Sequence, residues 1–378
     1  MTVAGWLAVL LAALPAVLCL VNRWALARRP VPVSADPAPL HVSILIPARD
    51  EAANIGPALG AAQASQGVRL EILVMDDGST DSTAAIVRDH AERDPRVRLL
   101  QAPPLPAGWG GKAHVCQRLS EQASGDWLLF VDADVRLAPD AALVLADHAR
   151  RHGMGLVSGV PRQLMATLGE LLTVPMINLL IHGYLPVPMM RRKPTDPSLA
   201  AACGQLLLFE RSAYQRAGGH AAVRWSRHDG LQLARHLRRR GIATDLIDGA
   251  PLATCRMYDG LRSAWEGFVK NAREGMATPA ALPIWTFLLL GGHVLPWLLL
   301  VLALLGWGSP VPALLALLLS LGMRLAVTFL AREPLASVPL HPLTVLVALA
   351  IQWDALIRGG TGRQVGWKGR SYPSGAAP

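Results

Sequence analysis

The chain has 378 residues, 52% of them hydrophobic, and a formal net charge of +9 at pH 7. This length allows one large or two ordinary domains, and four scattered cysteines without CxxC spacing indicate neither a disulfide framework nor a zinc site. The apolar residues gather at the two ends of the chain. The composition therefore predicts a membrane protein with a water-soluble middle.

The first predicted element is a membrane anchor over residues 1–22. Residues 1–21 carry no charge, and at about 1.5 Å per residue they would cross an apolar core of about 30 Å. Arg23, Arg28 and Arg29 follow the apolar run, whereas a cleaved signal peptide has its positive charges before the run. We therefore expect a retained anchor with the following domain in the cytoplasm, by the positive-inside rule.

Residues 38–278 are predicted to form an α/β domain. Strands separated by helices of this length are typical of right-handed βαβ units in a mostly parallel, Rossmann-like sheet. The expected strands cover residues 41–47, 70–79, 97–100, 127–134 and 155–160. Helical patterns lie between them, from about residue 51, over 79–94, over 112–123 and over 139–151.

Two of the predicted strands end in acids, Asp76 and Asp77 on the second and Asp132 and Asp134 on the fourth. Ligands bind at the carboxyl ends of strands in such sheets. Asp132 and Asp134 would point the same way if the strand stayed extended through them, and like charges so close repel unless a cation lies between them. The chain has no Walker A motif and no GxGxxG after the first strand. A bound phosphate would then need a metal, and carboxylates with open positions suit Mg²⁺ or Mn²⁺.

The C-terminal part, residues 280–358, is again apolar, with candidate spans at 283–306, 311–331 and 338–357. An outside N-terminus followed by four full spans would leave the basic tail at 359–378 outside, against the positive-inside rule. We therefore expect one C-terminal segment to be re-entrant or interfacial.

An apolar stretch at residues 167–190 is broken by three prolines. It is predicted either as an interfacial segment or as a core helix of the soluble domain. The basic runs Arg191–Lys193 and Arg238–Arg240 are compatible with nucleic acid as a binding partner. Beside membrane spans, however, anionic headgroups or a phosphorylated substrate are favoured, and we expect no nucleic acid.

Three motifs resemble one family. "PARDE" (47–51), "MDDGSTDST" (75–83) and "VDADV" (131–135) are similar in order and spacing to family-2 glycosyltransferases with the A-type nucleotide-sugar fold. "GWGGKAHVC" (108–116), "RMYDGLRSAWEGFVKN" (256–271) and "VGWKGRSY" (365–372) resemble the lipid-directed branch, which includes carotenoid (diaponeurosporenoate) and hopanoid-associated glycosyltransferases. Members of that branch also have an N-terminal anchor and C-terminal spans.

The resemblance implies roles for individual residues. Asp132 and Asp134 would form the metal-binding DxD pair, and Asp229 would be the general base. His228 precedes Asp229 where the family usually has Glu, so His228 remains an alternative for the base. Contacts to the nucleotide sugar would come from Pro47, Glu51, Asp76, Asp77, Lys112, Asp132, Gly204 and Gln205.

The implied function is that of a multi-pass cell-membrane, inverting glycosyltransferase. It would use Mg²⁺ or Mn²⁺ and a nucleoside-diphosphate sugar, with a UDP-sugar expected, and would act on an isoprenoid, carotenoid or hopanoid-like lipid. Two alternatives remain open: a polyprenyl-phosphate or ceramide sugar transferase, and a non-catalytic membrane scaffold that binds a nucleotide sugar.

Overall fold

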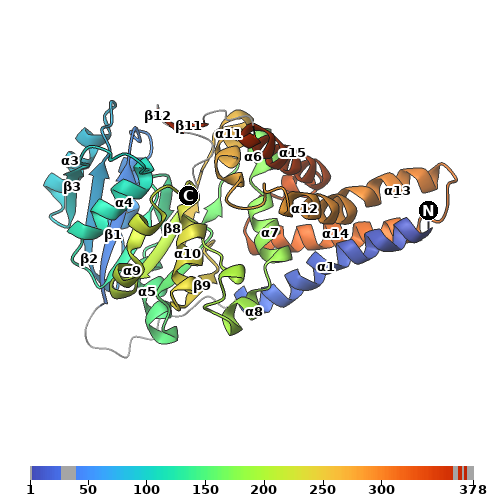
Figure 1. Ribbon diagram of the computed structural model, residues 1–378, viewed down its shortest axis with the longest axis horizontal. Helices are drawn as coiled ribbons and strands as arrows, with labels where there is room; N and C mark the ends of the chain where they lie inside the picture. Colours follow the sequence, from blue (N-terminus) through green and yellow to red (C-terminus); the bar gives the residue numbers. More distant parts are fainter. Residues whose placement is uncertain (1, 27–39, 361–364, 368–369, 373–378) are drawn as a thin grey trace.

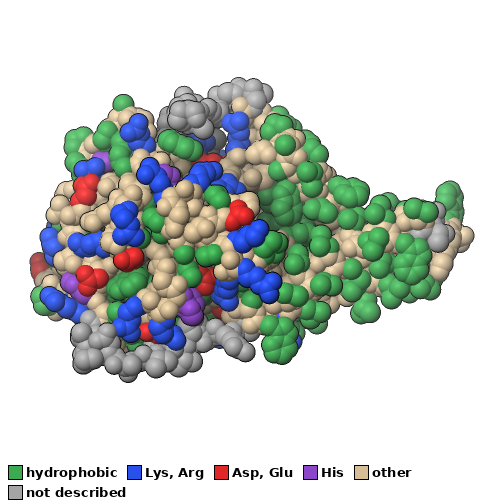
Figure 2. All heavy atoms as spheres, turned by 60° about the horizontal axis from the view of Figure 1, so that its bottom comes forward, with side chains coloured by type: hydrophobic (Ala, Val, Ile, Leu, Met, Phe, Trp, Pro, Cys, Tyr) green, Lys and Arg blue, Asp and Glu red, His purple; other side chains and the backbone are tan. Residues whose placement is uncertain are grey.

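The structure is a computed structural model that describes residues 2–26, 40–360, 365–367 and 370–372. An α/β part lies at one end of the molecule, and long helices project from it, with the N-terminus near the far tip (Figure 1). The side chains on the projecting helices are largely apolar, whereas charged side chains cover the α/β part (Figure 2). This division matches the predicted soluble middle and apolar ends.

A seven-stranded sheet organises the α/β part, in the order β3-β2-β1-β4-β8-β6-β9. Neighbours among the first four strands run parallel, β8 runs antiparallel to both β4 and β6, and β9 runs parallel to β6. The sheet is therefore mostly parallel, and the predicted α/β fold class is confirmed. The strands are β1 (Leu40–Ala48), β2 (Val68–Asp76), β3 (Val97–Gln101), β4 (Trp127–Val131), β6 (Leu156–Gly159), β8 (Leu206–Glu210) and β9 (Thr244–Ile247).

Helices cover both faces of this sheet. Alternate residues of β1 show the division: Val42 and Ile44 pack into one hydrophobic cluster and Leu45 into the other. Because both faces are buried, the strands are apolar throughout. The first cluster includes α2 (Ile55–Gln63), α3 (Thr83–Arg93) and α5 (Ala141–His152). The second includes α4 (Gly111–Gln122), α9 (Arg211–Ala217) and α10 (Asp229–Arg239).

Some predicted boundaries differ from the structure. The strand expected over residues 127–134 ends at Val131, and Asp132 to Asp134 form a turn before β5 (Val135–Leu137), so the extended geometry does not continue through the acids. The sequence analysis did not predict β8 and β9, since strands this short cannot be distinguished from helix by periodicity. A second, small sheet joins β5 to β10 (Ala253–Cys255) and β7 (Arg162–Gln163).

Four helices in the described part of the chain are long and apolar enough to cross a membrane: Val3–Leu26, Ala281–Leu304, Val311–Leu330 and His341–Gly359. They correspond to the predicted anchor and the three C-terminal candidates. The elements are α1 (Thr2–Leu26), α12 (Ala281–Leu289), a π-helical turn (Leu290–Val294), α13 (Leu295–Leu304), α14 (Val311–Leu330) and α15 (His341–Gly360). Arg28, Arg29 and most of the predicted basic tail lie outside the described residues. Beyond the end of α15, the structure describes two short strands of the tail, β11 (Val365–Trp367) and β12 (Arg370–Tyr372).

Helix α15 differs from the others in its position. Helices α1, α13 and α14 reach the far tip, whereas α15 lies beside α12 in the half nearer the α/β part (Figure 1). It begins midway along the bundle, where His341 Nε2 is 3.1 Å from His293 Nδ1. It ends where Gly359 approaches the Arg273 side chain. In the structure α15 thus occupies a different place from the other three long apolar helices, and the re-entrant or interfacial segment stays a prediction.

The stretch at residues 167–190 forms a junction between the two parts of the molecule. It folds into α6 (Leu168–Thr173), α7 (Met176–Tyr184) and α8 (Val187–Arg192). Asn22 of α1 donates hydrogen bonds to the carbonyl oxygens of His182, at 2.8 Å, and Leu185, at 2.6 Å. These bonds satisfy carbonyls at the end of α7, which has no continuing helix to pair them.

A buried ion pair joins α14 to the loop that follows it. Arg324 pairs with Glu333 and donates to Ser337 Oγ at 2.7 Å, and Asn178 of α7 donates to Glu333 at 2.7 Å. Arg324 is 1% exposed and Glu333 is 7% exposed. Removing one partner of a buried pair leaves the other charge uncompensated, which is far more costly than losing a surface pair.

The Arg324→Met variant is therefore expected to lower the free energy of unfolding by about 3–5 kcal/mol. Thermal unfolding of the detergent-solubilised protein measures this loss. The double variant Arg324→Met/Glu333→Gln should recover much of it, because no charge then stays unpaired. Arg93→Met, which breaks the exposed pair with Asp89, is the matched control. Equal effects of R93M and R324M would contradict the buried-pair assignment.

Candidate active site

The predicted site residues converge at the end of the large sheet that is formed by the carboxyl ends of its parallel strands. The parallel strands β1, β2 and β4 all end there. Because β8 is antiparallel to β4, with Leu206 opposite Val131, β8 begins at the same edge. The residues just before β8, Gly204 and Gln205, therefore lie beside Asp132. Strand direction alone thus explains how segments far apart in sequence reach one place.

Two loops at the ends of β1 and β2 are tied to each other. Arg49 donates from Nη1 to the Asp77 carbonyl oxygen at 2.5 Å, and its guanidinium lies 3.9 Å from the Asp77 carboxylate. The Glu51 backbone N–H donates to Thr83 Oγ1 at 2.8 Å. Asp76 is buried and accepts from the Ser79 backbone N–H at 3.2 Å. These bonds fix the carboxylates that the sequence predicts on the nucleoside side.

Lys112 links two acids that come from different elements. From the first turn of α4, its Nζ lies 2.7 Å from Asp132 Oδ1 and 3.2 Å from Asp229 Oδ2, and it donates to the Gly204 carbonyl oxygen at 3.3 Å. Burial opposes a charge on Lys112, but Asp132 and Asp229 outweigh burial and raise its pKa well above the ordinary value. Lys112 is therefore a charged ammonium that holds the end of β4 against the start of α10.

Asp134 has the features expected of a cation ligand. Its Oδ1 is buried and has no hydrogen-bond partner among the described residues. Burial, followed by Asp132 and Glu51, raises the pKa of Asp134 to about 7. No group of three or more His, Cys, Asp or Glu side chains in the described residues is arranged to hold a metal. Mg²⁺, however, is commonly held by one or two carboxylates plus substrate phosphates, and the Asp132–Asp134 pair fits that role.

Asp229 occupies the first position of α10, and Gly204 faces it. A Cβ on Gly204 would lie 2.6 Å from Asp229 Oδ1, and a Cβ on Gly230 would lie 2.6 Å from the Gly204 nitrogen. Only glycines allow this close approach. The sequence reading gave no role to Gly230, because its importance comes from a tertiary contact that spacing along the chain does not reveal.

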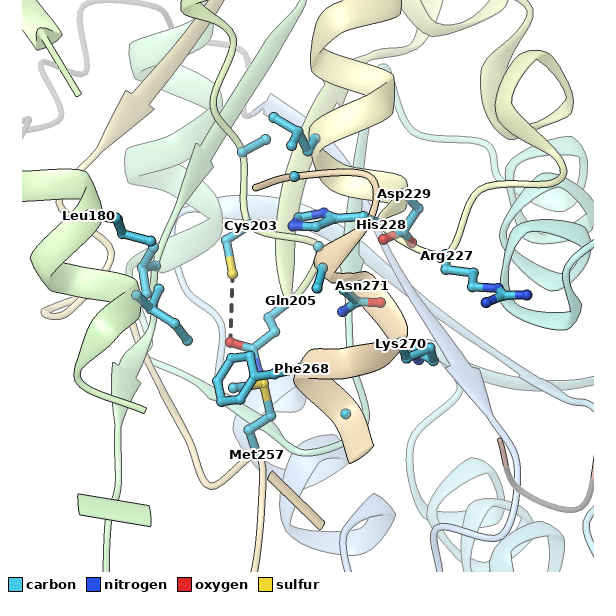
Figure 3. A pocket seen from close by; sticks show the side chains of 18 of the residues that line it. Leu180, Cys203, Gln205, Arg227, His228, Asp229, Met257, Phe268, Lys270 and Asn271 are labelled. Atoms are coloured by element: carbon cyan, nitrogen blue, oxygen red, sulfur yellow. Dashed lines mark hydrogen bonds between the residues drawn. The ribbon is translucent and has the colours of Figure 1, made fainter. Parts of the chain in front are cut away.

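Asp229 is ionised despite its burial. Burial raises its pKa, but Lys112, His220 and the Gly230 N–H together lower it by more, and the net shift is downward. His228 is half-buried beside it, and removal from solvent lowers the His228 pKa despite the nearby Asp229 and Glu274. Both residues lie at the start of α10 in Figure 3. A carboxylate in its charged form can accept a proton from a substrate hydroxyl.

Gln205 is anchored by the small sheet. Gln163 donates to Gln205 Oε1 at 2.9 Å, and Gln205 Nε2 donates to Cys255 Sγ at 3.0 Å. Cys203 Sγ lies 3.6 Å from Gln205 Oε1 (Figure 3). The small sheet, which the sequence reading missed, thus holds Gln205 in place.

One cavity of about 950 Å³ is lined by nearly all the predicted site residues and continues among the long apolar helices. Its polar half includes Pro47, Glu51, Asp77, Lys112, Asp132, Asp134, Gly204, Gln205 and Asp229. Its apolar half includes Ile177, Leu180, Tyr184, Trp285, Leu289 and Leu349, which come from α7, α12 and α15. The rings of Tyr184 and Trp285 meet edge to face, with centroids 5.3 Å apart. Asp76 is the one predicted site residue that does not line this cavity.

Helix α11 (Leu261–Ala272) forms a further wall of the cavity, with Lys270 and Asn271. Burial, followed by Lys112, lowers the Lys270 pKa to about 8. The sequence suggests a headgroup contact for both Lys270 and Asn271, and the resemblance adds a possible diphosphate contact for Lys270; the structure places both residues on the cavity wall.

Residues 43–216 match the family described as Glycosyl transferase family 2. The chain contains a family 2 glycosyltransferase domain. The predicted resemblance and the predicted class of enzyme are thereby confirmed at the level of this domain.

Curated relatives carry the name 4,4'-diaponeurosporenoate glycosyltransferase. The protein from Staphylococcus aureus (strain MRSA252) is 28% identical over 65% of this chain and 66% of its own length. The one from Staphylococcus haemolyticus (strain JCSC1435) is 28% identical over 63% of this chain and 62% of its own length. The matched part thus spans slightly less than two thirds of these relatives.

A solved structure shares the fold across nearly the whole chain. It is a mannosyltransferase from Pyrobaculum calidifontis, determined in complex with GDP-Man and Mn²⁺. The TM-score is 0.53 at 21% identity, and the match covers 93% of this chain and 99% of the other. The two proteins therefore share the A-type glycosyltransferase fold, and the match also takes in helices outside the α/β part.

Proposed function

We propose that the chain is a membrane-bound inverting glycosyltransferase that moves a sugar from a nucleoside diphosphate to a hydrophobic acceptor. The observation that supports this most is the single cavity with a charged half at the sheet edge and an apolar half among α7, α12 and α15. A soluble acceptor would not need the apolar half, and a lipid could reach the acids through it.

The donor occupies the charged half in this proposal. Glu51 and Asp77 hold the nucleoside, and Lys112 and Lys270 face the diphosphate. Asp76, predicted as a nucleoside contact, is buried behind the cavity and holds the loop after β2 through the Ser79 N–H instead. Related folds support the donor class, since the P. calidifontis enzyme was solved with GDP-Man. The expectation of a UDP-sugar stays a prediction.

A divalent cation, Mg²⁺ or Mn²⁺, fits beside Asp132 and Asp134. The support is the orphaned oxygen of Asp134 and the raised pKa that its carboxylate neighbours and burial produce. When bound, such a cation neutralises charge on the leaving diphosphate. The chain's own contribution is to hold both carboxylates at the end of β4 and to keep Lys112 between Asp132 and Asp229.

Asp229 is the proposed general base. Its Oδ2 accepts the proton of the acceptor hydroxyl as that oxygen bonds to the anomeric carbon and the bond to the diphosphate breaks. Attack from the Asp229 side, opposite the leaving group, inverts the anomeric carbon. Lys112 keeps the carboxylate charged and oriented, and Gly204 leaves room for it.

The orientation of the chain in the membrane follows, in this proposal, from the charge of the tail and from the position of α15. If α1, α12–α13 and α14 cross the membrane and α15 does not, the tail returns to the side of the α/β part. Both then lie in the cytoplasm, as the positive-inside rule requires for a basic tail. This arrangement removes the conflict that four crossing helices create.

Filling the apolar half should separate lipid transfer from donor chemistry. Leu180→Trp is expected to reduce sugar transfer to lipid by about tenfold or more, because the larger ring occupies acceptor space. Metal-dependent hydrolysis of the donor should stay within about twofold of wild type, because the donor half is unchanged. Both are measured on the purified protein, with the acceptor supplied as extracted membrane lipid.

Leu168→Trp is the matched control, since Leu168 is 60% exposed and does not line the cavity. Equal transfer by L180W and L168W would remove the support for an acceptor in the apolar half. If the wild-type protein hydrolysed no donor at all, the non-catalytic scaffold would be favoured.

A further inference from the structure

Besides the carboxylate oxygens of the candidate site, two amide oxygens that line the cavity have no hydrogen-bond partner among the described residues. Asn271 Oδ1 and Gln352 Oε1 are both buried, and neither accepts a hydrogen bond from any described residue. Both side chains line the cavity. Buried carbonyl oxygens are almost always paired, and an unpaired one is destabilising. A bound molecule that donates hydrogen bonds accounts for both atoms at once.

The two side chains belong to helices that pack directly against each other. Their chain neighbours Ala272 and Ile351 lie in one buried cluster. Trp265 Nε1 of α11 donates to Asp354 Oδ2 of α15 at 2.8 Å and fixes the pair of helices. Both oxygens therefore sit at the α11–α15 junction. Figure 3 shows Asn271 near Asp229 and His228, on the reactive side of the cavity.

The position of Gln352 indicates whether these oxygens contact the sugar donor or the lipid acceptor. Gln352 is on α15, and the α15 residues that line the cavity with it are Ala348, Leu349 and Ile351, all apolar. The α15 side of the cavity is therefore the acceptor side, whereas hydroxyls of the donor sugar would lie near the DxD pair. The two amide oxygens thus lie where the head group of a lipid acceptor would join its hydrocarbon chain.

We infer that the acceptor head group carries at least two hydrogen-bond donors, the hydroxyl that reacts and a second hydroxyl or N–H, and that Asn271 and Gln352 accept from them. Two carbonyl oxygens require two donated hydrogens. An ionised carboxylate offers none and a lone alcohol offers one. The inference rests on the proposed function: in the transfer step the reacting hydroxyl turns its one hydrogen from the amide oxygen to Asp229, its oxygen bonds to the anomeric carbon, and the diphosphate leaves.

Three amphiphiles with the same chain length test this: 1,2-hexadecanediol, 1-hexadecanol and hexadecanoate. Their binding to the full-length protein in detergent is followed by tryptophan fluorescence, since Trp285 lines the cavity. The diol is expected to bind about tenfold more tightly than the alcohol or the acid, the size of effect that pairing a buried carbonyl gives. Equal binding of all three to the wild-type protein overturns the inference.

Isosteric variants locate the effect. Asn271→Leu and Gln352→Met each remove a carbonyl while keeping the side-chain volume, and each should abolish most of the preference for the diol. Gln66→Met, at an exposed position, should keep it. A preference that survives in both N271L and Q352M overturns the assignment to these residues.

Donor hydrolysis distinguishes failure of the proposed function from failure of the head-group inference. A protein that hydrolyses a nucleotide sugar but shows no preference for the diol supports the proposed function and contradicts this inference. A protein that prefers the diol but hydrolyses no donor contradicts the proposed function and keeps the head-group preference.

Discussion

Asp229→Asn is expected to lower kcat for sugar transfer by about 10²–10⁴, the range that general-base catalysis contributes. The amide keeps the shape of the carboxylate and the oxygen that accepts from the Gly230 N–H at 2.9 Å. It cannot take a proton from the acceptor. Donor affinity should change much less, because Lys112 still has Asp132 as an ion-pair partner. Single-turnover transfer and equilibrium donor binding separate these two quantities.

His228→Gln is the matched comparison for this base assignment. If Asp229 is the base, H228Q loses far less activity than D229N. The reverse order would assign the base to His228 and contradict the role given to Asp229 here.

Asp134→Ala is expected to reduce transfer by about 10³ or more, because a cation that stabilises the leaving diphosphate contributes several kcal/mol. Removing an acid whose Oδ1 has no protein partner should leave the fold intact. Dependence of wild-type transfer on added Mn²⁺, and its loss with a chelator, is measured beside the variant.

Asp89→Ala controls for the loss of an acid, since Asp89 is exposed in a surface pair with Arg93 and such pairs contribute little to stability. Full transfer by D134A in the presence of chelator would contradict the cation site.

The sequence predicts the parts of the site that depend on strand ends. Asp76, Asp77 and Asp132 follow apolar runs, and the parallel arrangement that brings those ends together follows from the alternation with helices. Gly230, Asn271 and Gln352 could not be found this way. Their importance arises from contacts across the fold: α10 against the segment before β8, and α11 against α15.

The membrane part shows the same limit. Composition and length identify the apolar helices, since a span needs only about 20 apolar residues. The position of α15 depends instead on side-chain partners, such as His341 beside His293 and Trp265 bonded to Asp354. The charge of the basic tail predicts that one segment does not cross, and this stays a prediction.

The central claim is that a sugar passes from a nucleotide to a membrane lipid within one cavity. Incubating the purified protein with Mn²⁺, a panel of nucleoside-diphosphate sugars and total membrane lipid, followed by mass spectrometry of the extracted lipids, tests it most directly. We expect at least one donor to yield a lipid heavier by one sugar residue, and D134A to yield none. Release of the sugar into water or onto soluble acceptors alone, with no lipid product from any donor, would contradict it.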